Sequence, residues 1–429
     1  MSIAFAITLL LFATAMIIGV PIWASILVAS FPYFIMEDVP ITAVTSIMVS
    51  GQITSFILLA FPLFSLAGSF MNSGNISSRI FNFANTNVGW MRGGLGQVNI
   101  VASLLFAGMS GSAVADISGL GRVELRGMRE KGYDTEFSTG ITLASSVLGP
   151  IIPPSTPMIL YSVSSGVSVL SLFVGGVLPG LLIAAALMIK VYMTARKHNY
   201  AVEKVPTFRE HLQSWRDVFL SLLTPVIILV GMFSGIVTPT EAAAVAVIYA
   251  FLLGKFIYRE TTWRQVGHDI WESVVFCTNT YAIIAASMVF SFILTRENVG
   301  NSLVALVETM ALPQIAVIFM LLLVVLFLGC IIEVSAMIIL ILPIIMPIVT
   351  AVDYPPVAFG VIFVLTSVMG ILTPPFGLGL FMGSEISGLD FKATFRSVVP
   401  FITPLLIVIV LMVFFPMIVT FLPDLLLGK

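Results

Sequence analysis

The sequence predicts an all-α polytopic membrane protein, built as an inverted-topology repeat of two five-helix halves. Three observations support this prediction: high hydropathy, long apolar runs between short charged clusters, and two matched groups of helix breakers. Of the 429 residues, 59% are hydrophobic and 9% are charged, and the mean hydropathy is +1.12. Because a soluble domain carries about 25% charged residues, these values exclude a water-soluble protein.

Ten apolar runs are predicted to cross the lipid bilayer, at about 20 residues for each crossing. They cover residues 3–20, 21–35, 44–72, 134–165 and 167–198, and then 216–235, 238–258, 271–296, 355–386 and 395–423. Lys and Arg cluster at 122–134 and 190–216, which the positive-inside bias places in the cytoplasm. The loops 36–42 and 350–356 contain acidic residues and no basic ones, so we expect them to face outward.

Two further apolar segments, 94–121 and 313–351, are interrupted near their centres by small or polar residues. The interruptions read FAGMSGSAVAD at 106–116 and LGCIIEVSAM at 328–337. By the charge bias, each segment begins and ends on one side of the membrane. We therefore predict that each segment forms a re-entrant hairpin, which a membrane tolerates where protein or a cavity surrounds it.

A shift of 221 residues superimposes the helix breakers of the two halves. GPIIPPS at 149–155 then lies over GILTPPF at 370–376, and Gly108, beside the first interruption, lies over Gly329, beside the second. Two independent landmarks agree on one shift, which chance matches seldom achieve. Paired Gly/Pro-interrupted segments in corresponding halves indicate a transporter binding site near the middle of the bilayer.

The predicted organisation follows from this repeat. Residues 1–198 form the first repeat, 199–215 a cytoplasmic linker and 216–429 the second repeat. Each half contains one hairpin and one discontinuous helix, at 134–165 in the first half and at 355–386 in the second.

Broken helices expose backbone groups, each of which costs several kcal/mol if it stays unpaired in hydrocarbon. Such backbone persists where it lines a cavity or binds a ligand. Pro153 and Pro154 remove two donors and leave acceptors behind, which favours a cation. Helix N-termini and the amides of residues 110–112 supply positive potential for an anionic solute.

Three charged residues within or beside apolar segments are candidate functional groups. Asp116 is expected on an ion or substrate path, although it could instead lie near the cytoplasmic surface with Arg122. Glu333 favours a cation-linked role over a structural pairing. Arg296 could meet a substrate carboxylate or could be an interfacial anchor that pairs with Glu297.

Four strings between residues 110 and 381 resemble one transporter family: SGSAVAD, LGPIIPPSTPM, TPTEAAAVAV and TPPFGLGLF. The sequence is similar to the large membrane (M) subunit of tripartite ATP-independent periplasmic (TRAP) transporters, within the ion transporter superfamily. The resemblance implies sodium-driven uptake of an organic acid, of the sialic acid or C4-dicarboxylate type, across a bacterial inner membrane by an elevator motion. It also implies a periplasmic substrate-binding protein and a small four-helix membrane subunit on a separate chain.

The resemblance further implies one sodium site between each hairpin tip and the neighbouring helix break. The first site would use Ser110, Ser112, Gly149, Ile152 and Pro153. The second would use Glu333, Ser335, Gly370, Thr373 and Pro374. The residues expected to contact the substrate are Ser112, Asp116, Pro154, Ser155, Arg296 and Pro375. Family members often have Asp followed by Thr or Ser where this chain has IEVSA, which leaves open whether Glu333 binds the ion directly or through water.

Other functions are less well supported by the sequence. A carboxylate or ion antiporter of the same superfamily, which needs no binding protein, is the nearest alternative. An intramembrane hydrolase that uses Ser110 or Ser112 would need a base to activate the serine, and all three His residues lie in hydrophilic loops. No cofactor other than Na⁺ is expected. Nucleic-acid binding is not expected either, because no basic stretch is interleaved with aromatic residues.

Overall fold

The computed structural model describes residues 2–53, 55–198, 200 and 204–428, and this part of the chain folds into helices joined by short turns. Seven of the helices in the described part are long and apolar enough to cross a membrane. Large apolar side chains such as Trp263 and Trp271 are exposed on the outside of the bundle, where a soluble protein would place polar groups. The predicted class, an all-α multi-pass membrane protein, is confirmed.

The helices of the first half precede residue 199. They are α1 (Ile3–Ile18), α2 (Ile22–Met36), α3 (Thr42–Ile53), η1 (Phe56–Leu59), α4 (Ala60–Ser73), α5 (Ile76–Val88), α6 (Leu95–Ser110), α7 (Ala113–Ala115), η2 (Asp116–Leu120), α8 (Gly121–Glu130), α9 (Thr135–Ser145), η3 (Ser146–Leu148), α10 (Thr156–Ser165) and α11 (Val169–His198).

The helices of the second half follow residue 207. They are α12 (Phe208–Phe233), α13 (Pro239–Leu252), η4 (Leu253–Ile257), α14 (Trp263–Arg296), α15 (Val299–Met310), α16 (Gln314–Gly329), α17 (Val334–Ala351), α18 (Pro356–Gly370), α19 (Leu378–Ser387), α20 (Phe391–Phe414) and α21 (Met417–Leu427).

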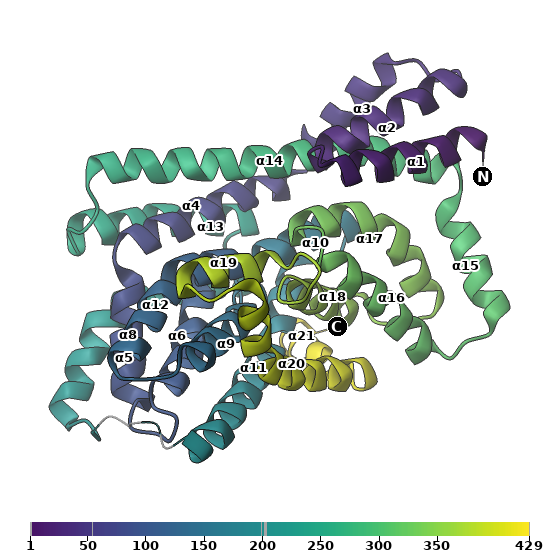
Figure 1. Cartoon of the computed structure of the whole chain (residues 1–429). Helices are drawn as coiled ribbons and strands as arrows, with labels where there is room; N and C mark the ends of the chain where they lie inside the picture. The colour runs from purple at the N-terminus through teal and green to yellow at the C-terminus, as the bar shows by residue number, and fades with distance from the viewer. Residues whose placement is uncertain (1, 54, 199, 201–203, 429) are drawn as a thin grey trace.

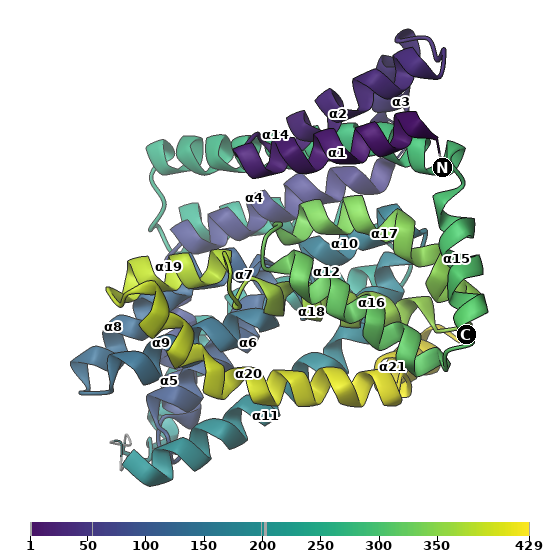
Figure 2. The same cartoon turned by 45° about the vertical axis from the view of Figure 1, so that its right-hand side comes forward.

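The hairpins and broken helices lie between two groups of flanking helices. Figures 1 and 2 show α14 and α4 on one side, and α11, α20 and α21 on the opposite side. Between them lie α6 and α9 of the first half and α16 to α18 of the second. Every residue of α18 from 358 to 370 is buried, so this helix forms part of the centre of the core. The broken segments are therefore surrounded by protein over most of their length.

Both pairs of interrupted segments occur where the pattern predicts them. The first hairpin consists of α6 followed by α7, η2 and α8, with its tip at 111–112, and the second consists of α16 and α17, with its tip at 330–333. The chain is not helical between η3 and α10, or between α18 and α19. The Pro153–Pro154 and Pro374–Pro375 peptide bonds are both cis.

Several element bounds differ from the predicted spans. The span predicted at 44–72 is divided into α3, η1 and α4, whereas α14, which the 221-residue shift places over it, is one helix of 34 residues. The amphipathic α5 and the short α15 were not predicted. The predicted linker at 199–215 is shorter than expected, because a capping box at Thr207 and Glu210 starts α12 inside it. Residues 199 and 201–203 of that linker lie outside the described residues.

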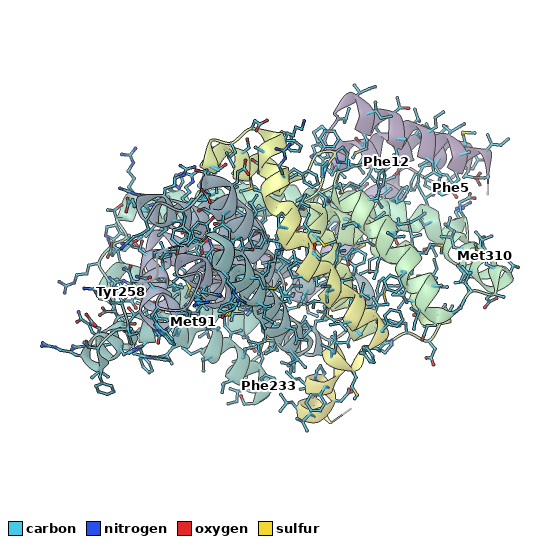
Figure 3. The ribbon with its side chains drawn as sticks, turned by 60° about the horizontal axis from the view of Figure 1, so that its bottom comes forward. Phe5, Phe12, Met91, Phe233, Tyr258 and Met310 are labelled. Atoms are coloured by element: carbon cyan, nitrogen blue, oxygen red, sulfur yellow. The ribbon has the colours of Figure 1, made fainter. Side chains whose placement is uncertain are left out.

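The N-terminal helices attach to α14 through a second, smaller hydrophobic core. Figure 3 shows Phe5 and Phe12 on α1 at one end of the molecule. Phe12 packs against Phe290 of α14, with ring centroids 6.0 Å apart. The N-terminal helices α1 and α2 therefore pack against the C-terminal end of α14. This end of α14 is remote in sequence from both hairpin tips.

Candidate functional site

The tip of the first hairpin is bonded to the start of α10. Gly111 adopts a left-handed conformation with φ of 59°, which turns the chain between α6 and α7. Its carbonyl accepts hydrogen bonds from the Thr156 amide at 3.3 Å and from the Thr156 hydroxyl at 3.1 Å. The sequence did not single out Thr156, although it follows the Pro-rich break directly. Tip and break therefore form one unit.

Gly149 brings the end of η3 into contact with the same tip. A Cβ atom at this position would lie 2.9 Å from the carbonyl carbon of Ser112, closer than real Cβ atoms approach. Ser112 begins α7 as its N-cap, and its hydroxyl accepts a hydrogen bond from the Ala115 amide at 3.4 Å. The predicted residues Ser112 and Gly149 are thus neighbours in the structure.

Ser110 supplies an unpaired oxygen at this tip. Its side chain is buried, and its Oγ atom has no hydrogen-bond partner among the described residues. Leaving a buried polar group unpaired costs about 1–3 kcal/mol, so this oxygen is free to accept a further partner. Ser155 differs, because its hydroxyl donates to the Pro150 carbonyl and accepts from the Met158 amide. Ser155 is therefore occupied as the N-cap of α10.

The tip of the second hairpin is bonded to the second break. The Gly377 amide donates to the Cys330 carbonyl at 3.0 Å, and the Cys330 thiol lies 3.0 Å from the Thr373 hydroxyl. The Thr373 hydroxyl in turn donates to the Gly370 carbonyl at 2.9 Å. Thr156 and Gly377, the two amide donors, are related by the same 221-residue shift that aligns the prolines.

Glu333 caps the second arm of its own hairpin. Its carboxylate accepts from the Ser335 amide at 2.9 Å, the Ser335 hydroxyl at 3.0 Å and the Ala336 amide at 3.2 Å. Under the shift Glu333 corresponds to Ser112, and each residue accepts the amide three positions further on. Both second arms therefore begin with a side-chain cap at the tip, and the structural pairing considered for Glu333 is present.

The two breaks differ in exposure. Pro153 and Pro154 are buried, whereas Pro374 and Pro375 are exposed together with Phe376, whose side chain is 58% accessible. The first break is thus enclosed by protein, and the second is open on one side. Ile152, the remaining residue predicted for the first site, is half-buried beside α11, where a Cβ on Gly180 would lie 2.2 Å from its Cδ1 atom.

Of the other predicted substrate residues, Arg296 lies away from both tips, whereas Asp116 is buried close to the first tip, where its amide donates to the Ser112 carbonyl. Arg296 is exposed and donates to the Glu37 carbonyl at the end of α2. Its neighbour Glu297 accepts hydrogen bonds from Ser2 and Tyr33. Asp116 is buried and accepts a hydrogen bond from Ser103 at 2.9 Å, so it does not lie at the surface beside Arg122.

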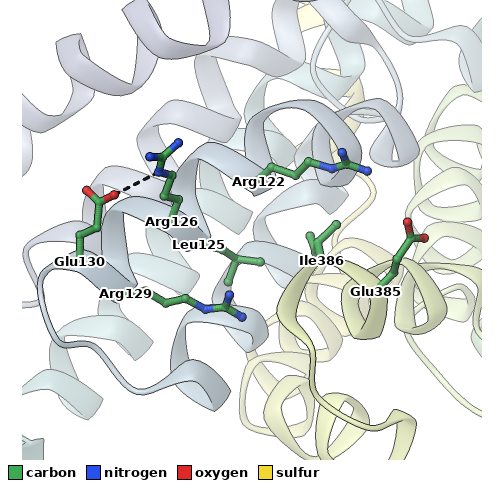
Figure 4. Close-up of a pocket in the computed structure, with 7 residues that line it drawn as sticks. All are labelled: Arg122, Leu125, Arg126, Arg129, Glu130, Glu385 and Ile386. Carbon is green, nitrogen blue, oxygen red and sulfur yellow. Dashed lines mark hydrogen bonds and ion pairs between the residues drawn. The ribbon is translucent and has the colours of Figure 1, made fainter.

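A basic cleft of about 440 Å³ lies between α8 and α19. Figure 4 shows Arg122, Arg126 and Arg129 on one wall and Glu385 on the other. The Arg129 guanidinium donates to the Ser387 carbonyl and so connects the first hairpin to the end of the second broken helix.

Comparison with known proteins agrees with this architecture. The chain is 41% identical to a sialic acid TRAP transporter large permease protein of Vibrio cholerae, over 96% of both chains. It is 38% identical to a sialic acid TRAP transporter permease protein of Haemophilus influenzae, over 98% of this chain and 68% of that one. A C4-dicarboxylate TRAP transporter large permease protein of Vibrio cholerae is 33% identical over 99% and 98% of the two chains.

A solved structure has the same fold at low sequence identity. The crystal structure of the YdaH transporter of Alcanivorax borkumensis matches with a TM-score of 0.61 and 12% identity, over 87% of this chain and 86% of that one. The family model described as the tripartite ATP-independent periplasmic transporter, DctM component, matches residues 6–418. The chain therefore belongs to the DctM component family of TRAP transporters.

Proposed function

We propose that this protein is the large membrane subunit of a sodium-coupled transporter that carries an organic acid across the bacterial inner membrane. The solute is of the sialic acid or C4-dicarboxylate type, two of the classes named for its relatives. The observation that supports sodium coupling most directly is the buried, unpaired Ser110 hydroxyl at a hairpin tip that is bonded to a helix break. Oxygen ligands of this kind suit a hard cation such as Na⁺.

The first proposed sodium site lies between the first hairpin tip and the first break. Its ligands are the Ser110 and Ser112 hydroxyl groups and the backbone carbonyls of Gly149, Ile152 and Pro153. The buried position of this break supports the assignment, because an enclosed site strengthens ion–dipole interactions.

The second proposed sodium site lies between the second tip and the second break. Its ligands come from Glu333, Ser335, Gly370, Thr373 and Pro374. All three hydrogen bonds to the Glu333 carboxylate come from its own hairpin arm, so this residue contributes a negative charge that is already fixed in place. The substrate carboxylate lies next to both sites, near Ser112, Pro154 and Pro375.

The two halves are proposed to be inverted repeats that move as an elevator. The tip-to-break hydrogen bonds from Thr156 and Gly377, and the caps Ser112 and Glu333, support the repeat because one shift relates both pairs. Each hairpin is bonded to its broken helix, so the pair can move as one body against α4 and α14.

Two partners are proposed: a periplasmic substrate-binding protein and a small membrane subunit on a separate chain. The Haemophilus influenzae relative supports the second partner. It matches 98% of this chain, but this chain covers only 68% of its length, so that relative has room for a further membrane segment within one polypeptide. Family membership makes the protein a transporter rather than an enzyme, so the alternative of an intramembrane serine hydrolase was wrong. The binding-protein-independent antiporter remains the alternative to test.

Uptake in proteoliposomes tests the proposal. Vesicles that contain this chain and its small partner are supplied with radiolabelled sialic acid or succinate, with candidate binding proteins, and with or without an inward sodium gradient. Accumulation that needs both the gradient and a binding protein supports the proposal. Equal accumulation without a binding protein would favour the antiporter, and accumulation without sodium would contradict sodium coupling.

A further inference from the structure

A chain of buried polar side chains joins two acidic residues inside the first half. Asp116 and Glu124, both on the second arm of the first hairpin, are 2% and 1% exposed. The side chains between them come from α6 and α9 and are all buried. In order, the chain runs through Asp116, Ser103, Ser145, Asn99, Thr142 and Glu124.

The heavy-atom distances establish that this chain is continuous. Ser103 Oγ lies 2.9 Å from Asp116 Oδ2 and 3.1 Å from Ser145 Oγ. Ser145 Oγ lies 2.7 Å from Asn99 Oδ1, and Asn99 Nδ2 lies 2.7 Å from Thr142 Oγ1. The Thr142 side chain completes the chain with a hydrogen bond to Glu124.

A count of hydrogen atoms shows that one more proton is needed. The chain has five hydrogen-bond links. Each of the three hydroxyl groups supplies one hydrogen, and the Asn99 nitrogen supplies one to its single link, with Thr142, so four hydrogens are available. Four hydrogens cannot fill five links if both carboxylates are ionised, because Ser103 would then have to donate to Asp116 and to Ser145 with a single hydrogen. A proton on Asp116 that is donated to Ser103 completes the chain. If the Asn99 side-chain nitrogen and oxygen exchange places, the count is the same, and the added proton lies on Glu124 instead.

The charges around the pair agree with this count. Asp116 Oδ1 and Glu124 Oε1 are buried and have no hydrogen-bond partner among the described residues, and the two carboxylates repel each other. Two ionised carboxylates in a buried site are strongly unfavourable without a cation. The charged groups on the elements packed around them are Arg79 on α5, Arg122, Arg126, Arg129 and Glu130 on α8, Glu136 on α9 and Glu385 on α19.

These neighbouring cations are engaged elsewhere or point away from the pair. Arg79 pairs with Glu260, Arg126 pairs with Glu130, and Arg129 donates to the Ser387 carbonyl. Figure 4 shows Arg122 directed into the basic cleft on the outer side of α8. The compensating positive charge therefore has to come from a bound species.

The acidic pair has no counterpart in the second half. In the second half, the 221-residue shift places Met337, Ile345, Val324, Met320 and Phe363 where the first half has Asp116, Glu124, Ser103, Asn99 and Thr142. Of these, Met337, Ile345 and Phe363 are buried in the core, whereas Met320 and Val324 are exposed, and Ser145 corresponds to the buried Thr366. The second half thus has no carboxylate at either position, and the acidic pair belongs to the first half alone.

We propose that the Asp116–Glu124 pair is a proton-binding site that holds one proton beside the first hairpin tip. When the site empties, the Asp116 O–H bond breaks, the proton passes to water, and Ser103 turns its hydrogen from Ser145 to the new carboxylate. The link between Ser103 and Ser145, which joins the hairpin to α9, is then lost. The second hairpin has no counterpart, so proton release acts on the first half alone.

Infrared spectroscopy of the purified protein at neutral pH tests this site without relying on transport. We expect a carbonyl band of a protonated, buried carboxyl group that shifts in D₂O and is unaffected by sodium. Asp116→Asn supplies an amide donor to Ser103 in place of the proton, so the protein folds and the band is lost. Glu130→Gln, at an exposed carboxylate on the same helix, is the control and keeps the band.

The second measurement is the thermal unfolding midpoint as a function of pH. The midpoint of the wild-type protein should fall as the pH rises above about 4, the ordinary pKa of Asp, until the site releases its proton, because the folded protein holds a proton that the unfolded chain gives up. Asp116→Asn should reduce this fall. A wild-type protein with no such band, or a band that persists in the Asp116→Asn, Glu124→Gln double variant, would overturn the proposal. A band that sodium removes would overturn it as well, because the pair would then be a sodium site.

Discussion

Gly370 lies directly against Gly329, backbone to backbone, where the second broken helix meets the second hairpin. A Cβ atom on Gly370 would lie 2.5 Å from the Gly329 carbonyl carbon. The first half has the same kind of contact between Gly149 and the carbonyl carbon of Ser112, at 2.9 Å. In both halves a glycine at the edge of the break allows the hairpin tip to approach the exposed backbone.

Replacing either break glycine should therefore open the proposed ion site. We expect Gly370→Ala and Gly149→Ala each to lower sodium-driven uptake by about tenfold or more, because the added methyl group collides with backbone and costs about 1–3 kcal/mol. Uptake in proteoliposomes at saturating sodium measures this. The control is Gly267→Ala in α14, where an added Cβ meets no atom within 4 Å. Unchanged uptake in both break variants would show that the tip contact is dispensable.

Ser110 and Ser112 should respond differently to removal of their hydroxyl groups. Ser110 Oγ is buried and has no partner among the described residues, so Ser110→Ala should not lower the free energy of unfolding, because it removes an unpaired polar group that costs about 1–3 kcal/mol. Ser112 caps α7, so Ser112→Ala should cost about 1 kcal/mol. Both variants should raise the sodium concentration for half-maximal uptake, because each removes a proposed ligand.

Thermal unfolding and sodium titration of uptake separate these two effects. If Ser110→Ala destabilises the protein as much as Ser112→Ala, then the Ser110 hydroxyl has a structural partner and its assignment as a ligand is wrong. If the sodium requirement of Ser110→Ala equals that of the wild type, the first proposed sodium site does not use this residue.

Glu333 combines a cap with a charge, and substitutions can separate the two. Glu333→Gln keeps a side-chain oxygen for the Ser335 and Ala336 amides but removes the charge, so we expect near-normal stability and a higher sodium requirement. Glu333→Ala removes the cap as well and should cost about 1 kcal/mol more. Glu308→Gln, at an exposed acid on α15, is the matched control. An unaltered sodium requirement in Glu333→Gln would limit Glu333 to its role as a cap.

The hairpins and breaks were predictable because their signals are local. Gly149 and Gly370, and the proline pairs that follow them, interrupt apolar runs in a way that no continuous helix tolerates. The string TPTE at 238–241 is an equally local signal, typical of a capping box, and the structure contains one at Thr238 and Glu241. The division of the 44–72 span into α3, η1 and α4 was not predictable from the repeat. The residues that the 221-residue shift relates to this span form one uninterrupted helix, α14.

The polar chain beside the first tip could not be predicted from local pattern. Glu124 stands in the basic string RVELR, which indicates a solvated cytoplasmic face, and yet its side chain is 1% exposed. Its burial depends on how α8 packs against α9, and that requires the tertiary structure. The helix α5 was missed because its polar residues, including Arg79, give it too little hydropathy for a span although one face is buried.

Glu297 makes the attachment of α1 sensitive to acid. Its carboxylate accepts from the Ser2 amide at 2.7 Å, the Ser2 hydroxyl at 2.6 Å and the Tyr33 hydroxyl at 3.0 Å. The hydrogen bond from the Ser2 hydroxyl is the largest cause that holds the pKa of Glu297 below its ordinary value. The stabilisation is therefore fully present above the unfolded-state pKa of about 4.3 and is lost as the pH falls through the lower folded-state pKa.

Hydrogen exchange of the α1 amides at a series of pH values tests this acid sensitivity. Intrinsic exchange rates at each pH are divided out, so that only protection is compared. We expect protection of α1 in the wild-type protein to fall on acidification below about pH 4, because a protonated Glu297 accepts from Ser2 only weakly. Glu297→Gln should show lower protection at neutral pH and little further change, whereas Glu308→Gln should follow the wild type. Equal acid sensitivity in Glu297→Gln would assign the effect to another carboxylate.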